Sequence, residues 1–205
     1  MSKVIKVDRK ENVHYKIDEI NFDFFEGFDK VLIVGNHGSG AYPIFRWQIF
    51  NLNNQYQYLW VDNIGSKSFI DDLKKDNINV LYNESLEDLG MMKKYQRLFI
   101  NIVENQSINL DEAISRITIP FTLRVPAREI GGYSVERLRK DFDLIIIAKP
   151  NFEDEITQLI NIIPELKDEI KLLKHLDDVI FVGKSNVQVI KFKITKDFPL
   201  NASGV

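Results

Sequence analysis

The chain has 205 residues and no cysteine, and 27 lysines and arginines against 30 aspartates and glutamates give a formal net charge of −3. The lack of thiols excludes disulfides, thiolate metal sites and cysteine nucleophiles. The acidic balance argues against a surface coated with positive charge for non-specific nucleic-acid binding. With 44% apolar and 28% charged residues, the composition is that of a globular protein, and the length fits one α/β domain.

The expected organisation is a single domain over residues 1–205. It comprises an N-terminal lead-in over 1–30, a core over 31–178, and a terminal hairpin and tail over 179–205. The first ten residues alternate between charged and apolar types and contain no long apolar run. We therefore expect a cytoplasmic protein without a membrane partner.

Short apolar stretches alternate with helix-compatible stretches from residue 31 onward. The predicted strands cover residues 31–34, 57–61, 79–82, 98–103 and 143–148, and the predicted helices cover residues 42–52, 66–75, 84–95, 153–163 and 165–176. Residues 109–140 show no regular pattern, whereas residues 179–182 and 187–194 predict an antiparallel hairpin. Strands separated by helices are typical of βαβ units, so the predicted fold class is α/β, a mostly parallel sheet flanked by helices.

A glycine-rich turn follows the first core strand and precedes a predicted helix. Backbone amides in such a turn can hold phosphate groups. The candidate phosphate-binding residues are Gly35, Asn36, His37, Gly38, Ser39 and Gly40. A nucleotide-binding P-loop reads Gly-x-x-x-x-Gly-Lys-Ser/Thr. Here Gly35 and Gly40 have the required spacing, but Ala41 and Tyr42 replace the lysine and the hydroxyl residue, and Pro43 removes a further backbone donor.

The wider run over residues 17–40 resembles the start of the RecA-like core of KaiC-like and archaeal RadA- and RadB-like proteins. In that family a short segment ending in glycine precedes the strand and the P-loop, so the resemblance implies a RecA-like three-layer fold with a degenerate Walker A motif. It also implies a glutamate after the second strand and a Walker B aspartate after a later one. Asp62 and Asn63 follow the second strand, and Glu104 and Lys149 end the two later strands, so neither expected residue is present.

The resemblance implies a catalytically inactive RecA- or KaiC-like paralogue that acts as a regulatory or assembly subunit in DNA recombination or repair. No catalytic residue and no certain cofactor is predicted. The loop amides are compatible with residual ATP binding, but hydrolysis of ATP is not expected. The implied partners are further copies of the chain or an active RecA-like protein. Two alternatives remain open: a nucleotide-binding sensor without hydrolysis, and a Rossmann-type dinucleotide enzyme, since strand, glycine turn and helix open that fold too.

Five of the eight arginines fall within residues 116–139, beside a pair of glycines. Arginine binds phosphates through two parallel hydrogen bonds and stacks on bases, so this segment is a candidate contact for single-stranded DNA. The DNA-binding candidates are Arg124, Arg128, Arg137, Arg139 and Lys140. The competing interpretation is a solvated surface on which these groups pair with acidic neighbours at residues 129, 136, 141 and 143.

Three other features predict no chemistry. The three histidines are far apart in the sequence, so no metal site is expected. Ser39 lacks the Gly-x-Ser-x-Gly context of a serine hydrolase. The tripeptide Gly183, Lys184 and Ser185 resembles the end of a P-loop, but it lies between two predicted strands and is interpreted as a turn.

Overall fold

The computed structural model describes residues 15–17, 27–36, 38–41, 44–45, 58–62, 79–82, 96–102, 110–175, 178–184 and 187–192. Within these ranges the strands are β1 (Tyr15–Ile17), β2 (Lys30–Val34), β3 (Tyr58–Asp62), β4 (Asn79–Tyr82), β5 (Arg97–Asn101), β6 (Phe121–Val125), β7 (Leu144–Ala148), β8 (Asp178–Gly183) and β9 (Val187–Phe192). They form one sheet in the order β1-β9-β8-β7-β2-β6-β5-β3-β4. The strand that leads into the glycine turn is therefore central.

The sheet is mostly parallel. β2 pairs in parallel with β6 and with β7, and β5 joins β6 to β3 in the same direction. Among the described strands, only β8 runs opposite to the others, because it pairs antiparallel with both β7 and β9. The predicted α/β class and the predicted C-terminal hairpin are confirmed.

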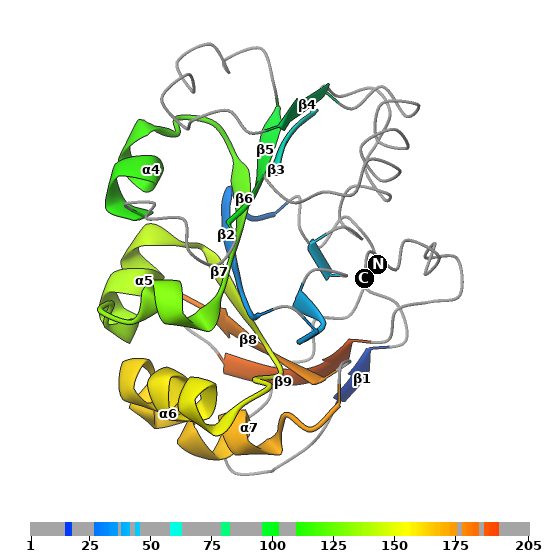
Figure 1. The fold of residues 1–205 in the computed structure, drawn as a ribbon, viewed down its shortest axis with the longest axis vertical. Coiled ribbons are helices and arrows are strands. Elements are labelled where there is room, and N and C mark those ends of the chain that lie inside the picture. The colour runs from blue at the N-terminus through cyan, green and yellow to red at the C-terminus, as the bar shows by residue number, and fades with distance from the viewer. Residues whose placement is uncertain are drawn as a thin grey trace.

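The described helical elements are α4 (Leu110–Arg116), η2 (Ala127–Ile130), α5 (Val135–Asp141), α6 (Glu153–Ile162), η3 (Pro164–Leu166) and α7 (Lys167–Leu172). Figure 1 shows α4 to α7 lying together along one face of the sheet. Pro164 begins a 3-10 turn between α6 and α7, because its ring fixes a helix-compatible φ while it lacks an amide donor. The helices predicted at 66–75 and 84–95, and most of the one at 42–52, lie outside the described residues.

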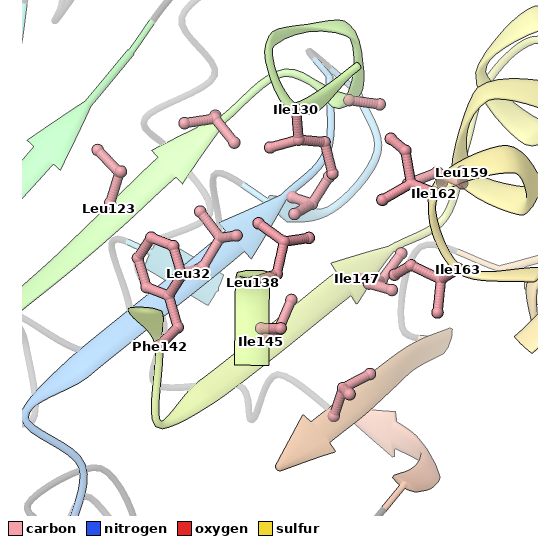
Figure 2. Packing of buried hydrophobic residues seen from close by; sticks show 14 of the residues in the cluster. Leu32, Leu123, Ile130, Leu138, Phe142, Ile145, Ile147, Leu159, Ile162 and Ile163 are labelled. Atoms are coloured by element: carbon pink, nitrogen blue, oxygen red, sulfur yellow. The ribbon is translucent and has the colours of Figure 1, made fainter. Parts of the chain in front are cut away.

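One apolar core fills the space between α4–α7 and the sheet. Leu32, Leu123 and Ile145 project from three neighbouring strands toward Leu138 of α5 and Ile162 of α6 (Figure 2). All of these side chains are buried, so the strand residues that face the helices and the apolar sides of the helices lie in the same layer. This packing fixes the carboxyl ends of β2, β6 and β7 at one edge of the sheet.

The segment expected to lack regular structure contains a central strand. β6 lies between β2 and β5, and its five residues are fully buried. Pro120 and Pro126 flank it, and Thr122 and Arg124 interrupt its apolar character. The interpretation of residues 109–140 as irregular was wrong because those two polar side chains are buried in the sheet, which a single-sequence pattern does not reveal.

The amino ends of β2 and β7 are joined through Asp143. Its Oδ2 accepts hydrogen bonds from the amides of Asp29 at 3.1 Å and Lys30 at 3.0 Å, and its Oδ1 pairs with the Lys184 ammonium. Burial raises the pKa of the Asp143 carboxyl, but Lys184 and the two amides outweigh that effect and hold this pKa below its usual value. Lys184 thus has a structural role directly after β8, whose last residue is Gly183, and Ser185 lies outside the described residues.

None of the helices in the described ranges combines the length and the apolar character needed to cross a bilayer.

Candidate functional site

The glycine turn after β2, residues 35–40, is called here the glycine loop. It leaves the carboxyl edge of the sheet, where Gly35 donates its amide to the Val125 carbonyl at 3.0 Å, and it ends in helical residues at 41, 44 and 45. Gly38 and Gly40 have φ angles of +78° and +87°, a region that side chains disfavour. The described part of the loop therefore has the order strand, turn and helix that a phosphate-binding turn requires.

Some of the hydrogen-bonding groups in and next to the glycine loop are bonded to other atoms of the protein. The fully buried Ser39 accepts the Ala41 amide on its Oγ at 3.2 Å, and the Ser39 amide donates to the Asn36 carbonyl at 3.2 Å. A Cβ at Gly35 would lie 2.4 Å from Ser39 Oγ, 2.7 Å from Ala41 Cβ and 3.0 Å from Ala148 Cβ. The Ser39 amide and the Ala41 amide that follows the loop are thus both satisfied by the protein, and the space over Gly35 is filled by protein atoms.

Arg124 joins three strand ends directly beneath the glycine loop. One guanidinium nitrogen donates to the Gly35 carbonyl at 2.8 Å, and the other donates to Asn101 Oδ1 at 3.1 Å and to the Ile102 carbonyl at 3.2 Å. The residue is only 5% exposed. Its position in the sheet interior separates Arg124 from the other four DNA-binding candidates, and its described contacts are with the protein.

A second buried polar contact fixes the other side of the glycine loop. Asn36 donates through Nδ2 to Glu155 Oε1 and accepts the Ala127 amide on Oδ1 at 2.9 Å, while Glu155 Oε2 accepts the Asn151 amide at 2.8 Å. Glu155 is 5% exposed, in the first turn of α6. The loop is therefore connected through side chains to both η2 and α6.

The positions that carry phosphoryl-transfer chemistry in a P-loop hold other residues here. Ala41, at the lysine position, is buried and apolar. β5 ends at Asn101, whose Oδ1 accepts a hydrogen bond from Arg124. Among the described residues, no group of three or more histidines and carboxylates could hold a metal ion. The side chains at 37, 42, 43, 62 and 104 lie outside the described residues.

Comparison with solved structures identifies a common fold. The genome packaging NTPase B204 from Sulfolobus turreted icosahedral virus 2, in complex with AMP, has a TM-score of 0.55 at 20% identity, covering 81% of this chain and 98% of that one. Its complex with AMPPCP has a TM-score of 0.55 at 18% identity, covering 81% and 99%. The crystal structure of B204, the DNA-packaging ATPase from Sulfolobus Turreted Icosahedral Virus, has a TM-score of 0.52 at 19% identity, covering 78% and 96%.

The chain has a P-loop NTPase fold. No protein-family model and no curated protein matches the sequence. The narrower resemblance to RecA- and KaiC-like proteins stays a prediction. The strand order disfavours the Rossmann alternative, because β3 is separated from β2 by β6 and β5, whereas a Rossmann sheet pairs its first two strands.

The remaining basic candidates lie around η2 and α5, and three of them pair with carboxylates. Arg128 lies 3.8 Å from Glu129, Arg137 pairs with Asp111, and Arg139 lies 3.9 Å from Glu165. Lys140 is exposed. Of the acidic neighbours expected from the sequence, Glu129 lies beside Arg128 and Asp141 lies 4.0 Å from Arg137, whereas Asp143 pairs with Lys184. DNA binding by these residues stays a prediction.

Tyr133 and Asp111 hold Arg137 in place between α4 and α5. The Tyr133 hydroxyl donates to Asp111 Oδ1 at 3.0 Å, and the Arg137 guanidinium lies 4.6 Å from the centre of the Tyr133 ring. Burial, followed by the hydrogen bond to Asp111, raises the pKa of Tyr133 to about 12, while the Arg137 charge acts in the opposite direction. Arg137 therefore has a structural partner on each side.

Proposed function

We propose that this protein is a non-hydrolysing P-loop-fold subunit that acts by assembly with further copies or with a related NTPase in a nucleic-acid-handling complex. The observation that carries the proposal is the combination of a buried Ala41 at the lysine position with Arg124 bonded to the Gly35 carbonyl. Phosphoryl transfer depends on cations and a magnesium ion that reach the phosphates. The buried cation beneath the glycine loop, Arg124, instead donates to the Gly35 and Ile102 carbonyls and to the Asn101 side chain.

The choice of a nucleic-acid-handling complex rests on the structural neighbours. These neighbours are a genome packaging NTPase and a DNA-packaging ATPase. This favours packaging or translocation of nucleic acid over the recombination or repair process that the sequence resemblance implies. It supplies a class of process and no interface residue.

A steady-state ATPase assay tests the loss of hydrolysis. We expect no magnesium-dependent phosphate release above background, with or without single- and double-stranded DNA. Turnover by the wild-type protein that Gly40→Glu abolishes would overturn the proposal, because Gly40 has a positive φ in the glycine loop. Gly132→Ala is the control for an unrelated glycine, since nothing lies within 4 Å of a Cβ there.

A nucleotide sensor is the second candidate, because Gly38 and Gly40 keep the left-handed geometry of a phosphate-holding turn. Isothermal titration calorimetry with AMP, ADP and ATP tests it. Binding by the wild type without turnover favours the sensor over the purely structural subunit. The double variant Ala41→Lys/Tyr42→Thr restores the motif, and we expect it to bind ATP at least about tenfold more tightly than the wild type, because it adds a cation beside the phosphates.

A further inference from the structure

The side chains of Asn36 and Glu155 form a buried link between three elements that are distant in sequence. We call their contact the loop bridge. It includes the hydrogen bonds from Ala127 to Asn36 at 2.9 Å and from Asn151 to Glu155 at 2.8 Å. In the bridge both Glu155 oxygens accept one hydrogen bond each, while Asn36 uses both its donor and its acceptor. The bridge thus joins the glycine loop, η2 and the first turn of α6.

A second contact connects α6 with the turn that carries Arg128. Gln158, one turn after Glu155, donates to the Arg128 carbonyl at 3.3 Å. The turn from 127 to 131 is closed by hydrogen bonds from the Glu129 amide to the Pro126 carbonyl and from the Gly131 amide to the Arg128 carbonyl, both at 3.1 Å. Helix α6 therefore contacts the glycine loop through Glu155 and the arginine-bearing turn through Gln158.

We propose that the loop bridge couples the conformation of the glycine loop to the turn over residues 127–131, so that a change at the exposed Gly38 alters how Arg128 is presented. The physical reason is that buried polar groups lose their solvation and cannot give up a partner without cost. If the glycine loop moves, Asn36 either breaks two buried hydrogen bonds or moves Ala127 and α6 with it. The coupling does not require a bound nucleotide, so the experiments that test it are independent of those that test the proposed function.

Hydrogen exchange of Gly38→Ala measures the coupling. The substitution strains the loop because Gly38 has a φ of +78°, yet its nearest neighbour, Asn151 Nδ2, would be a comfortable 3.7 Å from the new Cβ. The reporters are the amides of Glu129, Gly131 and Tyr133, whose acceptors lie within residues 126–130. We expect these amides to exchange at least about threefold faster than in the wild type. Unchanged exchange would overturn the proposal.

Glu155→Gln then tests whether the bridge carries the effect. The introduced amide can satisfy either Asn36 or the Asn151 amide but not both, because each offers a donor. In this background we expect Gly38→Ala to have no effect on the three reporters. If Glu155 has only a structural role, Glu155→Gln should lower the global stability but leave the response of the reporters to Gly38→Ala unchanged. That result would contradict the coupling.

A reciprocal swap supplies the rescue. In Asn36→Asp/Glu155→Gln the introduced aspartate accepts from Ala127 and from the introduced glutamine, whose oxygen accepts from Asn151, so every bond of the bridge is restored. We expect the reporters to respond to Gly38→Ala again. Continued loss of the response in the swapped protein would overturn the proposal. If Glu155→Gln does not fold, Asn36→Ala replaces it as the broken-bridge background, and Asp143→Asn controls for destabilisation far from the glycine loop.

Discussion

The polar interactions that connect the central strands differ between the amino edge and the carboxyl edge of the sheet. At the amino edge, Asp143 joins β2 to β7 and pairs with the largely exposed Lys184. At the carboxyl edge, Arg124 and the loop bridge are buried, and their partners are mostly backbone carbonyls and amides. Water and salt weaken the first arrangement and reach the second far less. The edge that has the candidate site is therefore the more rigidly determined one.

Replacing Arg124 should have the largest effect. Arg124→Met leaves the Gly35 and Ile102 carbonyls and the Asn101 side chain without their described donor, so we expect the free energy of unfolding to fall by about 3 kcal/mol or more. Urea denaturation followed by circular dichroism measures it. Arg137→Met, which removes an exposed arginine, should cost less than about 1 kcal/mol. If both variants lost the same free energy of unfolding, the buried hydrogen bonds of Arg124 would contribute no more to stability than the exposed contacts of Arg137.

The close packing over Gly35 predicts the next largest effect. Gly35→Ala forces Ser39 or Ala41 to move, because the new Cβ would lie within 3 Å of both side chains. We expect a loss of about 1–3 kcal/mol, as for other overpacked sites. In Gly132→Ala the new Cβ points into open space, so the free energy of unfolding should change by no more than about 0.5 kcal/mol. Thermal denaturation of the pair gives the comparison, and a neutral Gly35→Ala would contradict the described loop.

The Asp143 contact predicts a smaller effect that depends on pH. Because the pKa of Asp143 is lowered in the folded state, its contribution to stability is present above the unfolded-state value and is lost as the pH falls through the folded-state pKa. Asp143→Asn should lower the free energy of unfolding by about 1 kcal/mol at pH 7, and should not change it at a pH below the folded-state pKa of Asp143. Denaturation curves of both proteins from pH 7 to pH 2 would converge in acid. A constant difference would contradict the role of the charge.

The basic surface around α5 should respond least in stability. Arg128→Glu and Lys140→Glu change exposed groups, so each should alter the free energy of unfolding by no more than about 0.5 kcal/mol. Fluorescence anisotropy with labelled single-stranded DNA at low and high salt tests the predicted contact. If these residues bind DNA, the affinity of the wild type should fall as the salt concentration rises, and each charge reversal should lower the affinity further. If the wild type does not bind DNA even at low salt, these residues form an ion-paired surface without a DNA contact.

The sequence predicted most of the sheet and little of the polar interior. Strands such as β2 and β7 are continuous apolar runs, and the glycine spacing located the loop, because both signals are local. Arg124 was grouped with the other arginines of residues 116–139 as a DNA-binding or solvated residue, whereas its burial depends on Gly35 and Asn101 at the ends of other strands. Nothing local marks Glu155, which lies in an acidic first helical turn whose other members face solvent.

Arg124 also determines how the molecule should respond to acid. A guanidinium keeps its charge at every pH at which a protein is handled, whereas the Asp143 carboxylate is neutralised as the pH falls. The bonds of Arg124 to the ends of β2 and β5 therefore outlast those of Asp143 at the opposite edge. Acid should therefore weaken the connection that Asp143 makes between the amino ends of β2 and β7, while Arg124 keeps its charge at the opposite edge.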